Sequence, residues 1–494
     1  MTTIVLTGAG FAIADIVALA RGGAALAAAP QVGEKLRRAR KILETAAAAG
    51  QKIYGLNTGL GANLNTSVAG DFAAFQRQLV RGRAMGLGAS LPSEIVRAVI
   101  AARLAMLAVG GSGISPSTFE ALAAMLNARV HPLIPAFGSI GAGDLVMLAA
   151  MARALIGEGQ AEYGGQIHEA AEALALAGLR PVTLAPKDGL SLMNASAVSV
   201  GQGALAIADA QKLFVAQRRA AALSFEALGG NPLILSPPVQ RARPAAGQAE
   251  EAAAMLAMLE GSSLFETQVA LQDPLSLRCV ASIHGALSAA LQAAEEAVEI
   301  ELNSASDNPL VLVEEGVVLS TGNFHTASLA LRFETLGLAI AQGALASAAR
   351  FIQLTGSARH GLPRYLSPVG GASAGFVPMQ KTVTALAAAL RHKANPILLD
   401  FHPVSEGVED HATQSVLVVQ KSAEMLDLWR QLIACEMLAA AQGVDLRPGH
   451  RCGQGVAPVH AFVRRLAPRL DEDRPLGEDA AAIAERLLSD DLRG

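Results

Sequence analysis

The chain has 494 residues, and alanine, leucine and valine carry most of its 52% hydrophobic content, because only 4% of the residues are aromatic. Alanine and leucine have high helix propensity, so this composition predicts a mostly α-helical protein. The 39 lysines and arginines nearly balance the 43 aspartates and glutamates, and the net charge of −4 excludes the strongly basic surface typical of nucleic-acid-binding proteins.

Membrane insertion and secretion are not indicated, although the mean hydropathy is +0.37. The longest stretch without a charged residue, 189–208, contains Asn194, Gln202 and three serines, which argues against a membrane-spanning helix. The first ten residues show no basic segment and no long apolar segment, and the cysteines are scattered, at Cys279, Cys435 and Cys452. We therefore expect a protein of the reducing cytoplasm, with no membrane partner.

The predicted elements, taken in chain order, are mainly helices. Short helices broken by glycine and proline occupy 11–49 and continue, after a glycine-rich loop at 54–61, to residue 174. Longer apolar or amphipathic helices follow at 188–224, 250–258, 283–300, 327–354 and 421–442. This pattern predicts a bundle of long antiparallel helices.

Strands are expected to be few and short. One is predicted at 4–6, and a hairpin is predicted from strands at 310–313 and 317–319. We expect a smaller N-terminal lobe over residues 1–190, followed by the helix bundle and a C-terminal helical region over residues 191–494.

Several widespread motifs are incomplete or missing. Gly8-Ala9-Gly10 resembles the start of a dinucleotide fingerprint, but Ile13 stands where a small residue is required. The histidines form no HExxH motif, and His392 lies between two cations that would repel a metal ion. We expect neither a bound nucleotide nor a metal ion.

Seven polar clusters interrupt the apolar sequence: the loop 54–61, Asn194, Arg278, 307–309, 322–325, Gln380-Lys381 and 409–411. Each has a simple structural interpretation on its own, as a glycine-rich connection, a turn, a satisfied buried amide, a core ion pair or a solvated helix face. Together they favour a functional site, because polar groups in an apolar core cost free energy unless they are paired or used.

The order of these clusters, with Glu301-Leu302-Asn303-Ser304 and the runs 138–141, 361–363 and 474–478, resembles the aromatic amino acid ammonia-lyases, and histidine ammonia-lyase most closely. The resemblance covers nearly the whole chain. It implies a carbon–nitrogen lyase with a small-molecule substrate and a central bundle of the fumarase/aspartase-like type. It also implies a homotetramer in which each active site is assembled from three subunits.

The chain departs from that family where the family makes its electrophile. Those lyases cyclise an internal Ala-Ser-Gly into a methylidene-imidazolone group, whereas this chain reads Gly141-Ala142-Gly143-Asp144-Leu145. No side chain in this run can be dehydrated to the exocyclic methylidene, so we expect no such cofactor. The other departures are Arg83 for a histidine, Leu275 for a tyrosine, Lys381 for an apolar residue and Val408 for a glutamine.

Other site residues of the family are retained, which favours altered chemistry over the decay of a dead enzyme. The retained residues are Tyr54, Asn194, Arg278, Asn323 and Glu409. The family's electrophile activates ammonia, a poor leaving group, and a substrate whose nitrogen is already quaternary needs no such activation. Trimethylamine leaves a betaine as a neutral molecule, so a base for the β-proton and a site for the carboxylate suffice.

This reasoning leads to a resemblance with the branch of the family that lacks the prosthetic group, typified by ergothionase, which splits ergothioneine into trimethylamine and thiourocanate. By that resemblance the catalytic residues are Tyr54, Glu409 and Lys381, and the substrate-binding residues are Asn194, Arg278, Asn323, Phe324, Gln380 and Arg83. Tyr54 would remove the β-proton, which requires its ordinary pKa of about 10 to fall. Arg278 would bind the carboxylate, and Lys381 with Glu409 would polarise the thione ring.

Two other interpretations stay open. The chain is then either a lyase or mutase for another amino acid derivative on the same scaffold, or a binding or scaffolding homologue without activity. The ring of the substrate could also belong to hercynine or another betaine. A retained base beside a missing electrophile favours the trimethylamine lyase.

Overall fold

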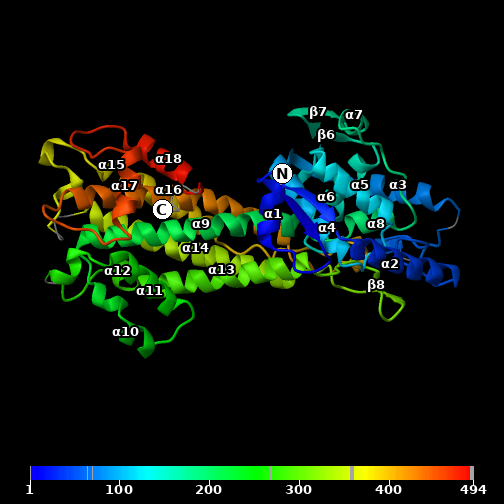
Figure 1. Cartoon of the computed structure of the whole chain (residues 1–494), viewed down its shortest axis with the longest axis horizontal. Helices are drawn as coiled ribbons and strands as arrows, with labels where there is room; N and C mark the ends of the chain where they lie inside the picture. The colour runs from blue at the N-terminus through cyan, green and yellow to red at the C-terminus, as the bar shows by residue number, and fades with distance from the viewer. Residues whose placement is uncertain (1, 64, 69, 268–269, 357–360, 490–494) are drawn as a thin grey trace. The chain divides into compact units, whose positions relative to one another are not determined.

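The computed structural model describes residues 2–63, 65–68, 70–267, 270–356 and 361–489 (Figure 1). Helices dominate and the strands among these residues are short, so the predicted mostly α-helical class is confirmed. The chain forms two compact units. Unit 1 comprises Met1–Ala208, Ala294–Arg332 and Pro396–Gln420, and unit 2 comprises Asp209–Ala293, Phe333–Asn395 and Lys421–Gly494. The boundary expected near residue 190 falls inside unit 1 and stays a prediction.

Unit 1 contains short helices and all the small sheets of the described residues. Its helices are α1 (Ile13–Ala20), α2 (Pro30–Ala48), α3 (Phe72–Arg83), α4 (Ser93–Ala108), α5 (Pro116–Asn127), α6 (Leu145–Leu155), α7 (Ala170–Leu176) and α8 (Asp188–Met193), with the 3₁₀ turns η1 (Gly61–Asn63) and η6 (Ser405–Gly407). Its strands are β1 (Thr3–Leu6), β2 (Ala25–Ala28), β3 (Leu87–Ser90), β4 (His131–Pro132), β5 (Pro135–Phe137), β6 (Gln160–Tyr163), β7 (Gln166–Glu169), β8 (Leu310–Leu312) and β9 (Val317–Leu319).

The predicted strands are present, and the structure adds others. β1 pairs in parallel with β2, and β8 pairs with β9 as the expected antiparallel hairpin. The further sheets join β3 to β5 and β4, β6 and β7 to one another. These additional strands have two to four residues, too short to show an alternating hydrophobic pattern.

Unit 2 contains helices and loops and no strand among its described residues. Its own elements are α10 (Pro237–Ala242), α11 (Gln248–Leu259), α12 (Leu275–Arg278), α15 (Val377–Lys393), α17 (Ala457–Leu466) and α18 (Leu476–Arg486), with the 3₁₀ turns η2 (Pro232–Leu235), η3 (Ser263–Glu266), η4 (Arg364–Leu366) and η5 (Gly370–Ala372). The longest helices contribute residues to both units: α9 (Ala197–Leu228), α13 (Val280–Leu302), α14 (Ala327–Leu354) and α16 (Ser415–Asp445).

Within unit 2 the long helices do not simply alternate in direction. Trp429 of α16 donates to Gln217 of α9 at 2.5 Å. Seven residues further along both helices, Ser224 of α9 donates to Glu436 of α16 at 2.7 Å. Because both residue numbers increase together, α9 and α16 run in the same direction. The antiparallel relation expected for all neighbours therefore does not hold for this pair, since the chain returns through α10–α13 before it enters α14 and α16.

A buried ion pair ties α14 to α16 in unit 2. The Arg350 guanidinium donates to Glu436 at 2.5 and 3.0 Å, and both side chains are fully buried. Arg350 also donates to the carbonyl of Ser276 at 3.1 Å, which holds the short helix α12 against α14. Removing one partner of such a pair costs about 3–5 kcal/mol, because the other charge stays buried and unpaired.

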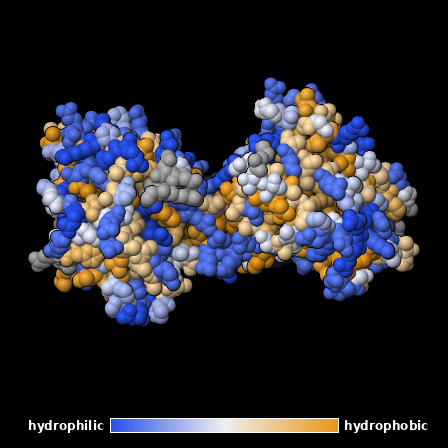
Figure 2. All heavy atoms as spheres, in the orientation of Figure 1, coloured by the Kyte–Doolittle hydropathy of each residue, from blue (hydrophilic) through white to orange (hydrophobic). Residues whose placement is uncertain are grey.

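Two helical segments have the length and composition of a membrane span, Asp188–Leu228 and α14. The apolar window of the first is completely buried inside the protein and that of α14 is 56% buried, as is usual for core helices. α14 keeps an exposed apolar stripe at every seventh residue: Leu331, Leu338, Leu345 and Ile352. Elsewhere, apolar side chains are interspersed with polar ones on the face shown in Figure 2.

Candidate active site

The Tyr54 loop packs against the helix that leads to Asn194. Gly55 has a φ of +69°, and a Cβ there would lie 2.4 Å from the side chain of Leu190 in α8, so only glycine fits. Buried Gln76 of α3 donates to the Gly55 carbonyl at 2.9 Å and accepts from the Gly189 N–H at 3.0 Å. These two hydrogen bonds connect the Tyr54 loop to α3 and α3 to α8.

The phenol oxygen of Tyr54 already has a hydrogen-bond donor. The backbone N–H of Gly61 donates to it at 2.7 Å, which favours a phenolate over a phenol. Arg83, the last residue of α3, also stabilises the phenolate by its charge, and Glu409 opposes it. Tyr54, Arg83 and Glu409 come from three separate segments and interact electrostatically, so the structure brings these three predicted residues together.

The pKa of Tyr54 does not fall as expected. Burial raises it above its ordinary value, Glu409 raises it further, and the Gly61 N–H and Arg83 counteract this only in part. The cause is desolvation, which disfavours the charged form of the side chain. Burial likewise lowers the pKa of Arg83, while Tyr54 and Glu409 raise it. The single chain therefore provides two groups that stabilise the phenolate, but the net effect of all contributions is a raised pKa of Tyr54.

Glu409 is presented by a tight turn. The Val404 N–H donates to the Glu409 carbonyl at 3.0 Å, and the Ser405 hydroxyl donates to the Glu409 carboxylate at 2.5 Å. A Cβ on Gly61 would lie 3.7 Å from the Ser405 hydroxyl, so this turn lies beside the Tyr54 loop. The carboxylate is thus held by its own turn, and its charge acts on Tyr54.

Asn194 and Phe324 border the loop that replaces the family's cofactor sequence. A Cβ on Gly143 would lie 3.3 Å from the Asn194 amide oxygen and 3.9 Å from the Cβ of Phe324. Buried Asn194 donates to the Asn308 carbonyl at 2.7 Å. Asn323 is exposed and donates to the Ala305 carbonyl at 3.5 Å. Asn194 and Phe324 are therefore part of one surface around residues 142–143.

Asp144 connects the loop at residues 142–143 to the start of α9. It is fully buried and accepts from the N–H groups of Val198 and Ser199 at 2.9 and 3.2 Å and from the Ser139 hydroxyl at 2.7 Å. Burial raises its pKa to about 6, although these hydrogen bonds lower it. The carboxylate joins the loop to the first turn of α9, so the loop's position is fixed by the bundle.

A histidine pair lies next to the same loop and was not predicted as part of the site. His325 Nε2 and His411 Nδ1 are 2.9 Å apart, and the backbone of His325 pairs with Ala142. Burial and the neighbouring His411 lower the pKa of His325. The available signal was position, because each histidine lies within two residues of a predicted site residue, Asn323 or Glu409.

A buried charge network supports α8 and was also missed. Arg103 donates to Asp307 and to the Ser191 carbonyl, each at 3.0 Å. Lys187 is fully buried and donates to the Ser112 carbonyl, and burial lowers its pKa to about 8 although Asp307 raises it. Since Ser191 precedes Asn194 and Asp307 precedes Asn308, this network holds both ends of the Asn194 hydrogen bond. Charged residues within apolar stretches were the available signal.

The other three predicted residues lie in unit 2 and bond within their own surroundings. Arg278 is exposed and donates to Gln272. Gln380 donates to the carbonyl and the hydroxyl of Thr355 at 3.1 and 3.0 Å. Exposed Lys381 donates to the Val377 carbonyl of its own helix at 3.5 Å. The structure thus gives these residues places on unit 2 but no common cluster among its described residues.

The fold and these motifs belong to a known class of enzymes. The aromatic amino acid lyase family model matches residues 11–465, and the chain belongs to this family of carbon–nitrogen lyases. Histidine ammonia-lyases from Treponema denticola and Sorangium cellulosum are 37% and 39% identical over 492 and 498 residues. These matches cover 99% and 98% of this chain and 97% of each relative.

Solved structures of the same family resemble the whole chain. The ergothionase from Treponema denticola, in complex with desmethyl-ergothioneine sulfonic acid, has a TM-score of 0.94 at 32% identity, covering 99% of each chain. A tyrosine aminomutase from Streptomyces globisporus also has a TM-score of 0.94, at 29% identity, covering 100% of this chain and 98% of that one.

The loop residues do not fit the methylidene-imidazolone group of this family. Ala142 carries a methyl group, and the chain reads Ala142-Gly143-Asp144 without a hydroxyl between them. The neighbouring hydroxyl, on Ser139, is already bonded to Asp144 at 2.7 Å. Cyclisation followed by loss of water needs a hydroxyl on the central residue, so this run cannot supply the methylidene. The absence of the group stays a prediction.

Proposed function

We propose that this chain is a cofactor-free lyase that eliminates trimethylamine from a histidine-derived betaine such as ergothioneine. The observation that carries the proposal is the cluster of Tyr54, Arg83 and Glu409 in a chain whose loop at Ala142 has no hydroxyl from which an electrophile could be made. A base without an electrophile suits a substrate whose nitrogen is already a good leaving group. The similarity to an ergothionase structure supports the same choice.

In the proposed reaction Tyr54 is the general base. Its phenolate, held by the Gly61 N–H at 2.7 Å and by the charge of Arg83, takes the β-proton and becomes a phenol. The electron pair of the broken C–H bond forms the Cα–Cβ double bond, and the Cα–N bond breaks with its electrons moving to nitrogen. Trimethylamine leaves as a neutral molecule and the product is a conjugated urocanate.

Substrate binding in the proposal uses residues from more than one copy of the chain. Glu409 and Lys381 contact the ring, which takes up negative charge as the β-proton is removed. Arg278 pairs with the carboxylate, with Asn194 and Asn323 as further donors. Arg278 and Lys381 are exposed on the single chain, so we propose that other copies in a homotetramer present them to the site. The exposed apolar stripe of α14 supports such an assembly.

A second candidate is an ammonia-lyase or aminomutase acting on an amino acid. It is favoured by the relatives named histidine ammonia-lyase and by the tyrosine aminomutase of the same fold. The loop at Ala142 argues against it, because ammonia is a poor leaving group without the electrophile.

Purified protein assayed against ergothioneine, hercynine and free histidine separates the two candidates. We expect trimethylamine release from a betaine and no ammonia from histidine. Release of ammonia from histidine would overturn the proposal. Intact-mass spectrometry provides a second reading, because the unmodified mass is expected, whereas a deficit equal to the waters of cyclisation would restore an ordinary ammonia-lyase.

A further inference from the structure

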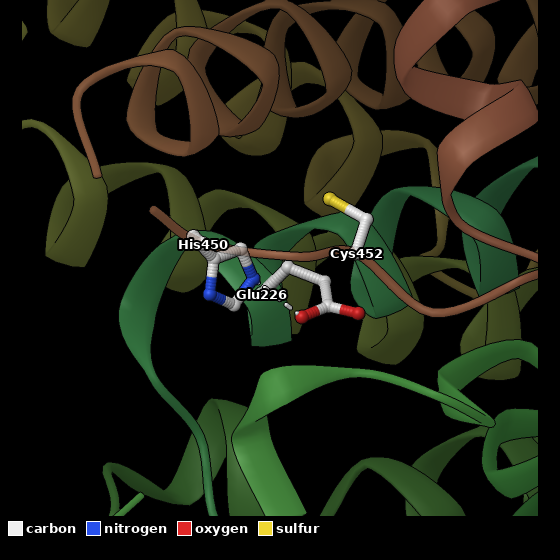
Figure 3. Close-up of side chains that lie close together, drawn as sticks. All are labelled: Glu226, His450 and Cys452. Carbon is white, nitrogen blue, oxygen red and sulfur yellow. Dashed lines mark hydrogen bonds and ion pairs between the residues drawn. The ribbon is translucent and has the colours of Figure 1, made fainter. Parts of the chain in front are cut away.

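A cluster of metal-ligating side chains lies in unit 2, and the proposed reaction uses none of them. Glu226 stands near the end of α9, and His450 and Cys452 come from the loop that follows α16 (Figure 3). One carboxylate oxygen, one imidazole nitrogen and the thiol sulfur all lie within 4.8 Å of one another. The set combines three ligand types that zinc ions bind in proteins.

Further hydrogen bonds orient two of these side chains. Fully buried Glu226 accepts from the Ser262 hydroxyl at 2.6 Å and from the Gly453 N–H at 2.8 Å, and it is bonded to His450 Nε2 at 2.7 Å. His450 Nδ1 lies 3.0 Å from the Ser263 hydroxyl. Metal ligands in proteins are typically held by such outer hydrogen bonds, which fix the ring and the carboxylate.

The surroundings of Ser263 allow the imidazole tautomer that a metal needs. The Ser263 hydroxyl can give its hydrogen to the Arg451 carbonyl at 3.4 Å. Its oxygen is then an acceptor for a hydrogen on His450 Nδ1, which leaves the lone pair of Nε2 for a cation. The Nε2 atom is the one that faces Glu226.

The charges around the thiol also suit a cation. The negative charges of Glu226 and Asp445 both act on Cys452. Asp445 already pairs with His460 and Arg464 at 2.7 and 2.8 Å. The guanidinium of Arg447, which interacts electrostatically with Glu226, donates its Nε–H to the Ala227 carbonyl of α9 at 2.5 Å. Cys452 is half-buried, so the cluster has a route to solvent.

We propose that Glu226, His450 and Cys452 bind a zinc-type divalent ion, with water as the fourth ligand. Tetrahedral zinc with ligands at 2.0–2.3 Å places them about 3.4–3.6 Å apart, so the three atoms reach this arrangement by shifts of about 1 Å. Bonds form from Sγ, Nε2 and a carboxylate oxygen to the ion. The thiol proton leaves to water, and the single hydrogen of the neutral imidazole stays on His450 Nδ1, next to the Ser263 hydroxyl. Magnesium and calcium prefer all-oxygen sites.

The ion would fasten the loop after α16 to the end of α9. A Cβ on Gly453 or Gly455 would lie within 2.7 Å of the backbone of residues 258–259, so this loop already packs closely against the end of α11. A ligand that binds only the folded state raises stability in proportion to the logarithm of its concentration. The structure therefore assigns this site a stabilising role that is independent of the lyase chemistry.

The test uses the full chain without a histidine tag, stripped with a chelator and titrated with zinc chloride and, separately, cobalt chloride. One ion per chain is expected, and cobalt should give a thiolate-to-metal charge-transfer band. Cys452→Ser should abolish the band and weaken zinc binding about tenfold or more. Cys435→Ala, which removes a buried thiol elsewhere in unit 2, is the control and should retain both.

The decisive comparison is between the wild type and Cys452→Ser, since a serine fits the half-buried position and Glu226→Gln risks the fold. A wild type that takes up no zinc at equimolar concentration would overturn the proposal. So would a Cys452→Ser protein that keeps the cobalt band or the wild-type affinity. Neither zinc uptake nor the cobalt band depends on lyase activity. The proposed function can therefore be disproved while the metal site is confirmed.

Discussion

Tyr54 and Arg278 are held in opposite ways. In unit 1, Tyr54 has a backbone donor at 2.7 Å and two charged neighbours from separate segments, and buried networks support the loops around it. In unit 2, Arg278 is exposed and its hydrogen bond goes to the nearby Gln272. The proposed base therefore has its partners within a single chain, whereas the proposed carboxylate anchor is exposed on the single chain.

The largest effect is expected from the built-in residue. Tyr54→Phe removes only the phenol oxygen, so turnover of the betaine should fall by about 10²–10⁴ while KM changes little. Steady-state kinetics measure both. Tyr163→Phe, in the β6–β7 hairpin, is the matched control and should keep wild-type turnover. Full activity of Tyr54→Phe would show that the base is another group.

A smaller effect is expected from the exposed residue. Arg278→Ala removes a charge-assisted bond to the substrate carboxylate, so kcat/KM should fall by about 10–100-fold, mainly through KM. Thermal unfolding should hardly change, because surface substitutions cost little. Arg430→Ala, at a partly exposed arginine paired with Asp427, controls for the loss of a guanidinium. An unchanged kcat/KM would remove Arg278 from the site.

Mixing the two variants tests whether Tyr54 and Arg278 act from different copies of the chain. If Tyr54 and Arg278 act from different copies, co-assembled Tyr54→Phe and Arg278→Ala chains contain some sites with both wild-type residues. Random assembly gives about one site in four, so about a quarter of wild-type activity should return. Each variant assembled alone gives the baseline. Failure of the mixed protein to exceed that baseline would place both residues in one chain's site.

The smallest effect is a shift in the titration of Tyr54. Arg83→Gln removes a charge that lowers the pKa of Tyr54, so the pKa should rise and the ascending limb of kcat/KM should move to higher pH. Glu409→Gln removes a charge that raises it, so the limb should move to lower pH. Absorbance titration can resolve this, because the chain has three tyrosines and Tyr54→Phe identifies the signal. Shifts in the same direction for both variants would contradict the cluster.

Much of the fold could be predicted because long helices leave a strong pattern. The helix expected at 327–354 has those bounds in the structure, and the hairpin around 314–316 is present. The division into units was not predictable, because each unit gathers three distant segments. The shortest strands were missed for lack of a pattern, and the direction of α9 relative to α16 depends on packing that no local sequence records.

The candidate site was predictable where a motif lies within one segment. Tyr54 and Asn194 stood out as polar groups in apolar surroundings, and the Tyr54 loop packs through Gly55 against Leu190 of α8, the helix that leads to Asn194. Long-range partners were not visible. The metal-ligand cluster shows the limit, since His450 and Cys452 are two residues apart but Glu226 precedes them by more than two hundred residues. The shift in the pKa of Tyr54 was also hidden, because burial depends on tertiary packing.

The exposed stripe on α14 constrains the shape of whatever lies along it. Its side chains recur every seven residues from Leu331 to Ile352, over a rise of about 32 Å at 1.5 Å per residue. On a straight α-helix, positions that recur every seven residues move around the helix axis by about 20° per repeat. A helix that follows the whole stripe must therefore wind around α14 with a left-handed supercoil, at a crossing angle near +20°. A flat or perpendicular partner would cover only part of the stripe.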